Sequence, residues 1–68
     1  MMGRKVEVFV DVHAVSATGL LVQRDPNVWV PRSQIDREES DLDPDHCTRG
    51  DSGGIVIPEW LATEKGLV

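Results

Sequence analysis

The chain has 68 residues, of which 40% are hydrophobic, and it carries twelve Asp and Glu against seven Lys and Arg, for a formal net charge of −5. This length predicts one domain over residues 1–68 with a thin core, since a chain of this size buries only about 60% of the surface that its unfolded form exposes. The negative charge argues against a module that grips phosphate groups through Lys and Arg, so direct binding to nucleic acid is not expected.

The expected compartment follows from the cysteine content and the N-terminal residues. Cys47 is the single cysteine, so no internal disulfide can form. The start of the chain, MMGRKVEV, lacks the apolar run of a signal peptide, and no window approaches the roughly 20 apolar residues of a membrane span. We therefore expect a protein of the reducing bacterial cytoplasm without membrane association.

The first part of the chain has a period of two. Over residues 5–13, valines alternate with charged, polar or aromatic residues, which predicts a β-strand with one apolar face. These valines are Val6, Val8, Val10 and Val12. Phe9 falls on the opposite face, so we expect the second side of the sheet to be covered there as well.

A hairpin is predicted next. Small residues and a glycine within residues 14–23 predict a turn or bulge that leads into a second strand over residues 20–22. Residues 24–27, RDPN, form a turn by composition. A third strand over residues 28–30 ends at Pro31, which cannot donate to a ladder.

The middle of the chain is predicted to be irregular. Residues 33–35 leave the sheet, with Ile35 returning inward. Residues 36–54 show no apolar periodicity and hold most of the surplus negative charge, so we predict a long acidic loop there. A loop of this length in a small domain is usually functional or disordered.

The last elements are a strand over residues 55–57 and a short helix over residues 59–65. Pro58 suits the start of the helix, and Gly66 suits its end. A helix this short needs tertiary packing, so we expect three side chains to dock on the sheet: Trp60, Leu61 and Leu67. The predicted fold is a small α+β domain, with a bent antiparallel sheet of about four strands, curved as a partial SH3-like barrel, and one C-terminal helix.

Two blocks, WVPRSQI at residues 29–35 and IPEWLATEKGL at residues 57–67, carry a family resemblance. They resemble short phage and prophage proteins that share a W-[IV]-P-[KR]-S-Q-I motif and a closing [IV]-x-E-W-L-A-x-E-K-G-L motif. The resemblance implies a compact antiparallel β-domain with a terminal helix, encoded by a mobile element, and it implies no activity. The chain departs from the common pattern in its long acidic insert, so we argue function from that insert.

One motif in the acidic loop looks enzymatic. GDSGG at residues 50–54 looks like the nucleophile motif of chymotrypsin-type serine proteases, with Ser52 as nucleophile and His13 or His46 as base. A triad also needs a buried Asp, an oxyanion hole and a specificity pocket, which need far more scaffold than this chain offers. We read the motif as a flexible turn before the last strand and predict no enzyme.

Two patterns that involve residues of this loop could suggest a metal site. Three alternate carboxylates resemble the opening of an EF-hand loop, but His46 stands where that loop needs glycine and Ser52 where it needs glutamate. These carboxylates are Asp41, Asp43 and Asp45. His13, His46 and Cys47 could supply three zinc ligands, but their spacing matches no zinc motif. We predict no metal and no other cofactor.

The tryptophans allow two interpretations. Trp29 and Trp60 could form an exposed platform on which bases stack, as in proteins that bind single strands. Because the core is small and the net charge is negative, we predict instead that both indoles pack in the core.

The acidic loop leads to the functional hypothesis. In an extended chain, alternate side chains lie about 7 Å apart on one side, so the loop could imitate a row of phosphates. The predicted partner-binding residues are Asp36, Glu38, Glu39, Asp41, Asp43, Asp45 and Asp51. We predict a phage-encoded, non-enzymatic inhibitor, an anti-CRISPR, that blocks DNA binding by a basic host complex such as a CRISPR surveillance complex.

The alternative is a structural or accessory phage protein that acts by protein–protein assembly through its sheet edge or tryptophan face. In that case the acidic loop only keeps the protein in solution. Either way we expect a monomer or a weak homodimer.

Overall fold

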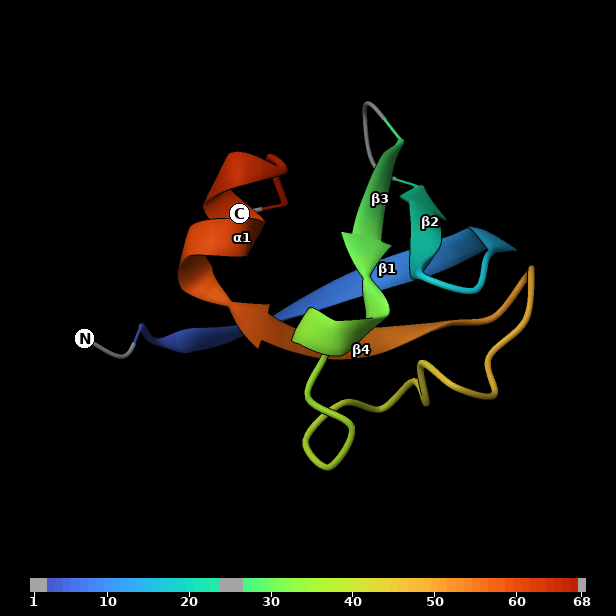
Figure 1. Ribbon diagram of the computed structural model, residues 1–68, viewed down its shortest axis with the longest axis horizontal. Coiled ribbons are helices and arrows are strands. Elements are labelled where there is room, and N and C mark those ends of the chain that lie inside the picture. The colour runs from blue at the N-terminus through green and yellow to red at the C-terminus, as the bar shows by residue number, and fades with distance from the viewer. Residues whose placement is uncertain (1–2, 24–26, 68) are drawn as a thin grey trace.

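The computed structural model describes residues 3–23 and 27–67 (Figure 1). Along the chain, the elements are strands β1 (Lys5–Val15), β2 (Gly19–Gln23) and β3 (Val28–Pro31), the 3-10 helix η1 (Arg32–Gln34), strand β4 (Ser52–Pro58) and helix α1 (Glu59–Glu64). All neighbouring strands pair antiparallel, in the order β3-β2-β1-β4. The sheet curls into a half-barrel, and α1 follows β4 directly, so the predicted small α+β fold is confirmed.

The period-two pattern of β1 places its valines on the concave face of the sheet. Val8 lies opposite Ile55 of β4, and Val12 lies opposite Val22 of β2. The register of β1 with β2 shifts between Val12 and Ala14, so the predicted bulge falls within β1. A bulge bends the strand and increases its twist, which helps the sheet to curl.

The core lies inside this curve. It contains the buried side chains Val8, Val10, Val12, Leu20, Val22, Val30, Ile35, Leu42, Cys47, Ile55, Ile57, Leu61, Ala62 and Leu67. As predicted, Ile35 returns inward after η1 and Leu61 and Leu67 dock on the sheet. Among the side chains whose burial the structure describes, no polar or charged one is buried, so this core is apolar.

Helix α1 is terminated by the glycine that the sequence predicted for this role. Gly66 has a φ of 73°, the left-handed conformation that glycine adopts most readily. The N–H of Leu67 donates to the carbonyl of Ala62 at 2.8 Å, and the N–H of Gly66 donates to Thr63 at 3.2 Å. These two bonds form a Schellman motif, which turns Leu67 back into the core.

The acidic loop is irregular, as predicted, but it is packed against the sheet. Leu42, Pro44 and Cys47 are buried, which the sequence interpretation missed. The loop also ends earlier than predicted, since β4 begins at Ser52 and its first three residues pair with β1. From here on, the acidic loop means residues 36–51.

Two predictions about buried aromatic side chains were wrong. Phe9 is 66% exposed, so the second side of the sheet is not covered at that point. Trp29 and Trp60 are 47% and 56% exposed, so neither indole belongs to the core. The physical reason is that small aliphatic side chains already fill the concave face, and α1 turns Leu61 inward instead of Trp60.

Part of one prediction lies outside the described residues. The turn predicted at residues 24–27 includes three residues that the structure does not describe, although β2 and β3 pair antiparallel on either side of it, as expected for a hairpin. Within the described ranges, no helix is long and apolar enough to cross a membrane.

Candidate functional site

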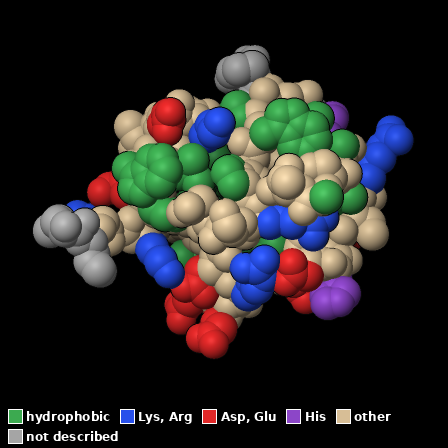
Figure 2. Space-filling model, in the orientation of Figure 1, with side chains coloured by type: hydrophobic (Ala, Val, Ile, Leu, Met, Phe, Trp, Pro, Cys, Tyr) green, Lys and Arg blue, Asp and Glu red, His purple; other side chains and the backbone are tan. Residues whose placement is uncertain are grey.

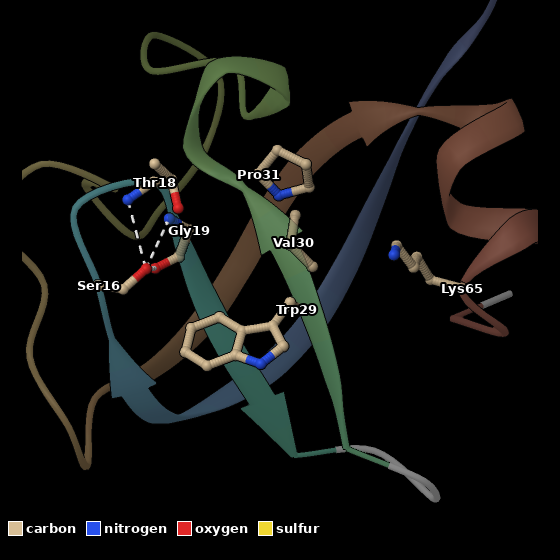
Figure 3. Close-up of a pocket in the computed structure, with 7 residues that line it drawn as sticks. All are labelled: Ser16, Thr18, Gly19, Trp29, Val30, Pro31 and Lys65. Atoms are coloured by element: carbon tan, nitrogen blue, oxygen red, sulfur yellow. Dashed lines mark hydrogen bonds between the residues drawn. The ribbon is translucent and has the colours of Figure 1, made fainter.

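A surface hollow of about 420 Å³ lies beside the edge strand β3 (Figure 3). We call it the β3 hollow. Its lining comes from the β1–β2 turn, from β3 and from the residue after α1: Ser16, Thr18, Gly19, Trp29, Val30, Pro31 and Lys65. In Figure 3, the indole of Trp29 lies on the side of Ser16 and Gly19, and Lys65 approaches from the end of α1. The hollow therefore combines an aromatic wall with one cationic group.

The wall formed by the β1–β2 turn depends on serine and glycine. The Oγ of Ser16 accepts hydrogen bonds from the N–H groups of Gly19 at 3.1 Å and Thr18 at 3.3 Å, which closes the turn. A Cβ at Gly19 would lie 2.8 Å from the backbone oxygen of Val30. Because a backbone atom cannot move aside as a flexible side chain can, glycine is required at this position for β2 and β3 to pair closely.

The backbone N–H and C=O groups of Trp29 point away from β2. The N–H of Arg32 donates to the carbonyl of Thr18 at 2.9 Å. Leu20, two residues after Thr18, pairs with Val30, two residues before Arg32. Since hydrogen-bonded and non-bonded pairs alternate in an antiparallel ladder, the pair of Leu21 and Trp29 is a non-bonded one. The N–H and C=O of Trp29 therefore point to the open edge of β3, and no group of the described residues bonds to them.

Lys65 supplies the charge of the β3 hollow. Within residues 3–23 and 27–67, no other charged residue lines the hollow and the ammonium of Lys65 forms no ion pair. Figure 2 shows hydrophobic side chains over α1 and over β3 on this face, with Lys and Arg side chains between and below them. Several Asp and Glu side chains gather at the lower rim of the same view.

The first predicted partner-binding residue, Asp36, is engaged within the protein. Its carboxylate accepts hydrogen bonds from Lys5 Nζ at 2.8 Å and from the N–H groups of Glu38 and Glu39 at 2.9 and 3.1 Å. The bond from Lys5, followed by the two backbone bonds, holds the pKa of Asp36 below its usual value. Asp36 thus ties the start of the acidic loop to β1.

Three more of the predicted carboxylates also have internal partners. Asp43 contacts His46 Nδ1 at 2.7 Å, Asp45 accepts from Arg37 Nε at 2.5 Å, and Asp51 accepts from the N–H of Thr48 at 2.9 Å. The bond with His46 lowers the pKa of Asp43 and raises that of His46, and the bond from Arg37 lowers the pKa of Asp45. These groups hold the turns of the loop.

The remaining predicted residues are Glu38, Glu39 and Asp41. They are exposed and, within the part of the chain that the structure describes, form no ion pair. The acidic loop runs through successive turns, so alternate carboxylates do not stand in one row. The extended geometry on which phosphate mimicry was predicted is therefore absent from the loop, although a smaller exposed acidic group is present.

The residues considered for catalysis and metal binding are dispersed. Ser52 lies opposite Asp11 at the start of β4, and it forms no hydrogen bond with His13 or His46 among the described residues. Cys47 is buried, and this burial raises its pKa. In the described parts of the chain, no three His, Cys, Asp or Glu side chains are grouped so as to hold a metal ion.

Comparisons with protein-family models, curated proteins and solved structures give no match for this chain. The resemblance carried by the two motif blocks therefore stays a prediction. The blocks nevertheless fall at informative places, since residues 29–35 span the aromatic wall of the β3 hollow and residues 57–67 include α1 and Lys65.

Sequence reasoning missed the β3 hollow, although one signal for it was present. The alternation of residues 28–30 places Val28 and Val30 on one face and Trp29 on the other. A tryptophan on the face opposite two inward-facing valines, on a strand that ends in proline, is the pattern of an edge strand with one face in solvent. Lys65 gave no such signal, because only the tertiary structure brings it near β3.

Proposed function

We propose that the protein is a non-enzymatic binding module that contacts another protein through the β3 hollow. The observation that carries this proposal is the exposure of Trp29, 47%, at the wall of a hollow of about 420 Å³. Tryptophan is enriched at the centres of protein interfaces, where its large rigid ring buries much area at little entropic cost. This is the assembly function that the sequence left as an alternative.

A nucleic-acid ligand at the same indole is disfavoured by charge. Proteins that stack bases on aromatic side chains also line the backbone path with Lys and Arg. Among the described residues, Lys65 is the one basic residue that lines the β3 hollow, and the net charge of −5 disfavours attraction of phosphate groups.

The test compares the two exposed tryptophans by quantitative affinity capture from cells that express the protein. Trp29→Ala is expected to remove the captured partner, while Trp60→Ala, which changes a similarly exposed indole outside the hollow, retains it. Both variants should keep the fold, since both side chains lie outside the core. Capture that survives Trp29→Ala, or that depends on Trp60 alone, contradicts the proposal.

A second candidate is the phage-encoded inhibitor of a host nucleic-acid-binding defence complex, an anti-CRISPR acting through the acidic loop. The observation that favours it is a group of exposed carboxylates that form no ion pair with any described residue: Glu38, Glu39 and Asp41. Such a group can be drawn to a basic groove by complementary fields, which raise the association rate.

The experiment for this candidate is inhibition of target-DNA binding by purified CRISPR surveillance complexes, one type at a time, at two salt concentrations. The acidic mechanism predicts inhibition that fades at high salt and that is lost when Glu38, Glu39 and Asp41 become Gln, Gln and Asn. Trp29→Ala should leave that inhibition unchanged. Absence of inhibition in every type contradicts the candidate, and inhibition that persists without the three carboxylates contradicts its mechanism.

A further inference from the structure

The open edge of β3 indicates how the partner binds. Resting on the proposed function, we propose that the β3 hollow receives an extended acidic segment of the partner protein, which adds to β3 as a fifth strand. A carboxylate of this segment lies against Lys65. The segment is thus recognised through its backbone by Trp29 and through its charge by Lys65.

The first argument is the difference between the two sheet edges. At the edge of β4, the acidic loop supplies partners for the backbone: the N–H groups of Asp36 and Asp41 donate to Val56 and Gly54 at 2.8 and 2.9 Å. At the edge of β3, the N–H and C=O of Trp29 receive no partner from the described residues. A row of unpaired edge groups is a template for another strand.

The second argument is the geometry at Trp29. Its N–H and C=O lie on the same side of the strand, so one residue of an added antiparallel strand can exchange two hydrogen bonds with it. Pro31 is the next residue that faces outward, and it has no N–H to donate. The added strand therefore pairs over a short stretch centred on Trp29, and the indole covers its side chains.

The third argument is the charge of the β3 hollow. Among the described residues that line it, Lys65 alone is charged and has no ion pair with another of them, so an incoming carboxylate has this cation to meet. A second copy of the protein is the other natural occupant of an open edge. In a twofold-symmetric contact the same patch faces itself, and the described residues of the lining offer no carboxylate for Lys65.

The test begins with a yeast-displayed library of random peptides of about twelve residues, selected on the full-length protein. The enriched peptides are expected to contain Asp or Glu and to be free of helical periodicity. A synthetic peptide from this set is then measured by fluorescence anisotropy against four variants: Trp29→Ala, Trp29→Pro, Lys65→Glu and Arg49→Glu.

The two Trp29 variants separate the indole from the backbone. Both lack the indole, but only Trp29→Pro also lacks the outward N–H, which takes no part in the pairing with β2. Proline is tolerated on an edge strand whose N–H faces solvent, and a circular dichroism spectrum checks the fold. Loss of one hydrogen bond predicts binding about fivefold weaker for Trp29→Pro than for Trp29→Ala.

The charge variants are matched, since Lys65→Glu and Arg49→Glu change the net charge equally. Arg49 lines a different hollow, with Asp11 and His13. We expect Lys65→Glu to weaken binding of the acidic peptide about fivefold and Arg49→Glu to leave it nearly unchanged. In the wild-type complex, the amide of Trp29 should become protected from hydrogen exchange, a readout that does not depend on any variant folding.

Several results would overturn the inference. Strand addition is wrong if Trp29→Pro and Trp29→Ala bind the peptide equally well and the Trp29 amide stays unprotected. The role of Lys65 is wrong if Arg49→Glu weakens binding as much as Lys65→Glu does. The inference also fails if the selected peptides lack acidic residues or if no peptide is enriched. A wild-type dimer that Trp29→Pro dissolves would assign the edge to a second copy instead. If partner capture still requires Trp29 while these tests fail, the proposed function stands and only the strand-addition mode is wrong.

Discussion

The two edge strands of the sheet, β3 and β4, differ in how far the rest of the chain covers their outward-facing backbone groups. An edge strand presents N–H and C=O groups that could pair with a strand of another chain. At β4 the acidic loop folds over the edge, where the Oγ of Ser40 accepts the N–H of Val56 at 2.8 Å and Leu42 is buried beneath. At β3 the chain continues into η1, and no segment among residues 3–23 and 27–67 pairs with the open edge. The stretch that looks most like a free functional loop in the sequence is therefore a structural cover, and the short third strand is the accessible surface.

The largest expected difference between the two edges is in the hydrogen-exchange rates of their backbone amides. The N–H of Trp29 is expected to exchange at nearly the rate of an unstructured peptide, because no group of the described residues accepts it. The N–H of Val56 should exchange at least about a hundredfold more slowly, because Ser40 must first release it in a local opening. Proton–deuterium exchange followed by NMR measures both, and equal rates at the two positions would remove the distinction between the edges.

The cover on β4 is expected to depend on Leu42. Its side chain packs against Gly53, where a Cβ would lie 3.2 Å from Leu42 Cγ. Leu42→Ala should lower the free energy of unfolding by about 2 to 3 kcal/mol, through lost apolar burial and the cavity left behind. Urea denaturation measures the loss. Asp41→Ala, at the exposed neighbouring residue, is the matched control and should change stability by less than about 0.5 kcal/mol. A similar small change for Leu42→Ala would mean that the loop does not seal the edge.

A smaller loss is expected at the hydrogen bond between Ser40 and Val56. Ser40→Ala removes the acceptor of the Val56 N–H, which is part-buried, so the free energy of unfolding should fall by about 1 kcal/mol. The exchange of the Val56 amide should accelerate in the same variant. Ser33→Ala, at an exposed serine in η1 without such a bond, provides the comparison, and equal effects from the two substitutions would refute the role of Ser40.

The smallest effect concerns the pair of Asp43 and His46 in the acidic loop. The pair raises the pKa of His46, so its stabilising contribution is fully present below the usual histidine pKa of about 6.5 and is lost as pH rises through the raised value. It lowers the pKa of Asp43, so the contribution is also lost as pH falls through that lowered value, below the usual 3.8. An NMR titration of the His46 ring should show its pKa falling in Asp43→Asn, and an unchanged pKa would show that the pair does not form in solution.

Local patterns in the sequence predicted the elements of the fold. The alternating valines of residues 5–13 identified β1, Pro58 and Gly66 bounded α1, and Ile35 was correctly placed inside. These features depend on neighbours in the chain, through the side-chain period of a strand or the backbone requirements of a helix end. They are therefore readable without tertiary information.

The predicted site could not be obtained in this way, because charge pattern does not reveal pairing. Asp36, Asp43 and Asp45 look free in the sequence, but Lys5, His46 and Arg37 hold them in the structure. Two of these contacts lie within the loop, whereas Lys5 is 31 residues from Asp36. The burial of Leu42 and Cys47 was missed for the same reason, since single apolar residues in an acidic stretch have no period.

The sequence by itself determined an apolar face on each strand, the position of α1, and a charge that disfavours nucleic-acid binding. Only the tertiary structure decided which surfaces stay open. The curled sheet has one apolar core on its concave side, which α1 and the acidic loop cover. The acidic loop also covers the edge of β4, whereas nothing in the described chain covers the edge of β3. Trp29 and Lys65 line the same hollow because the end of α1 lies beside β3, a long-range arrangement that no local pattern encodes.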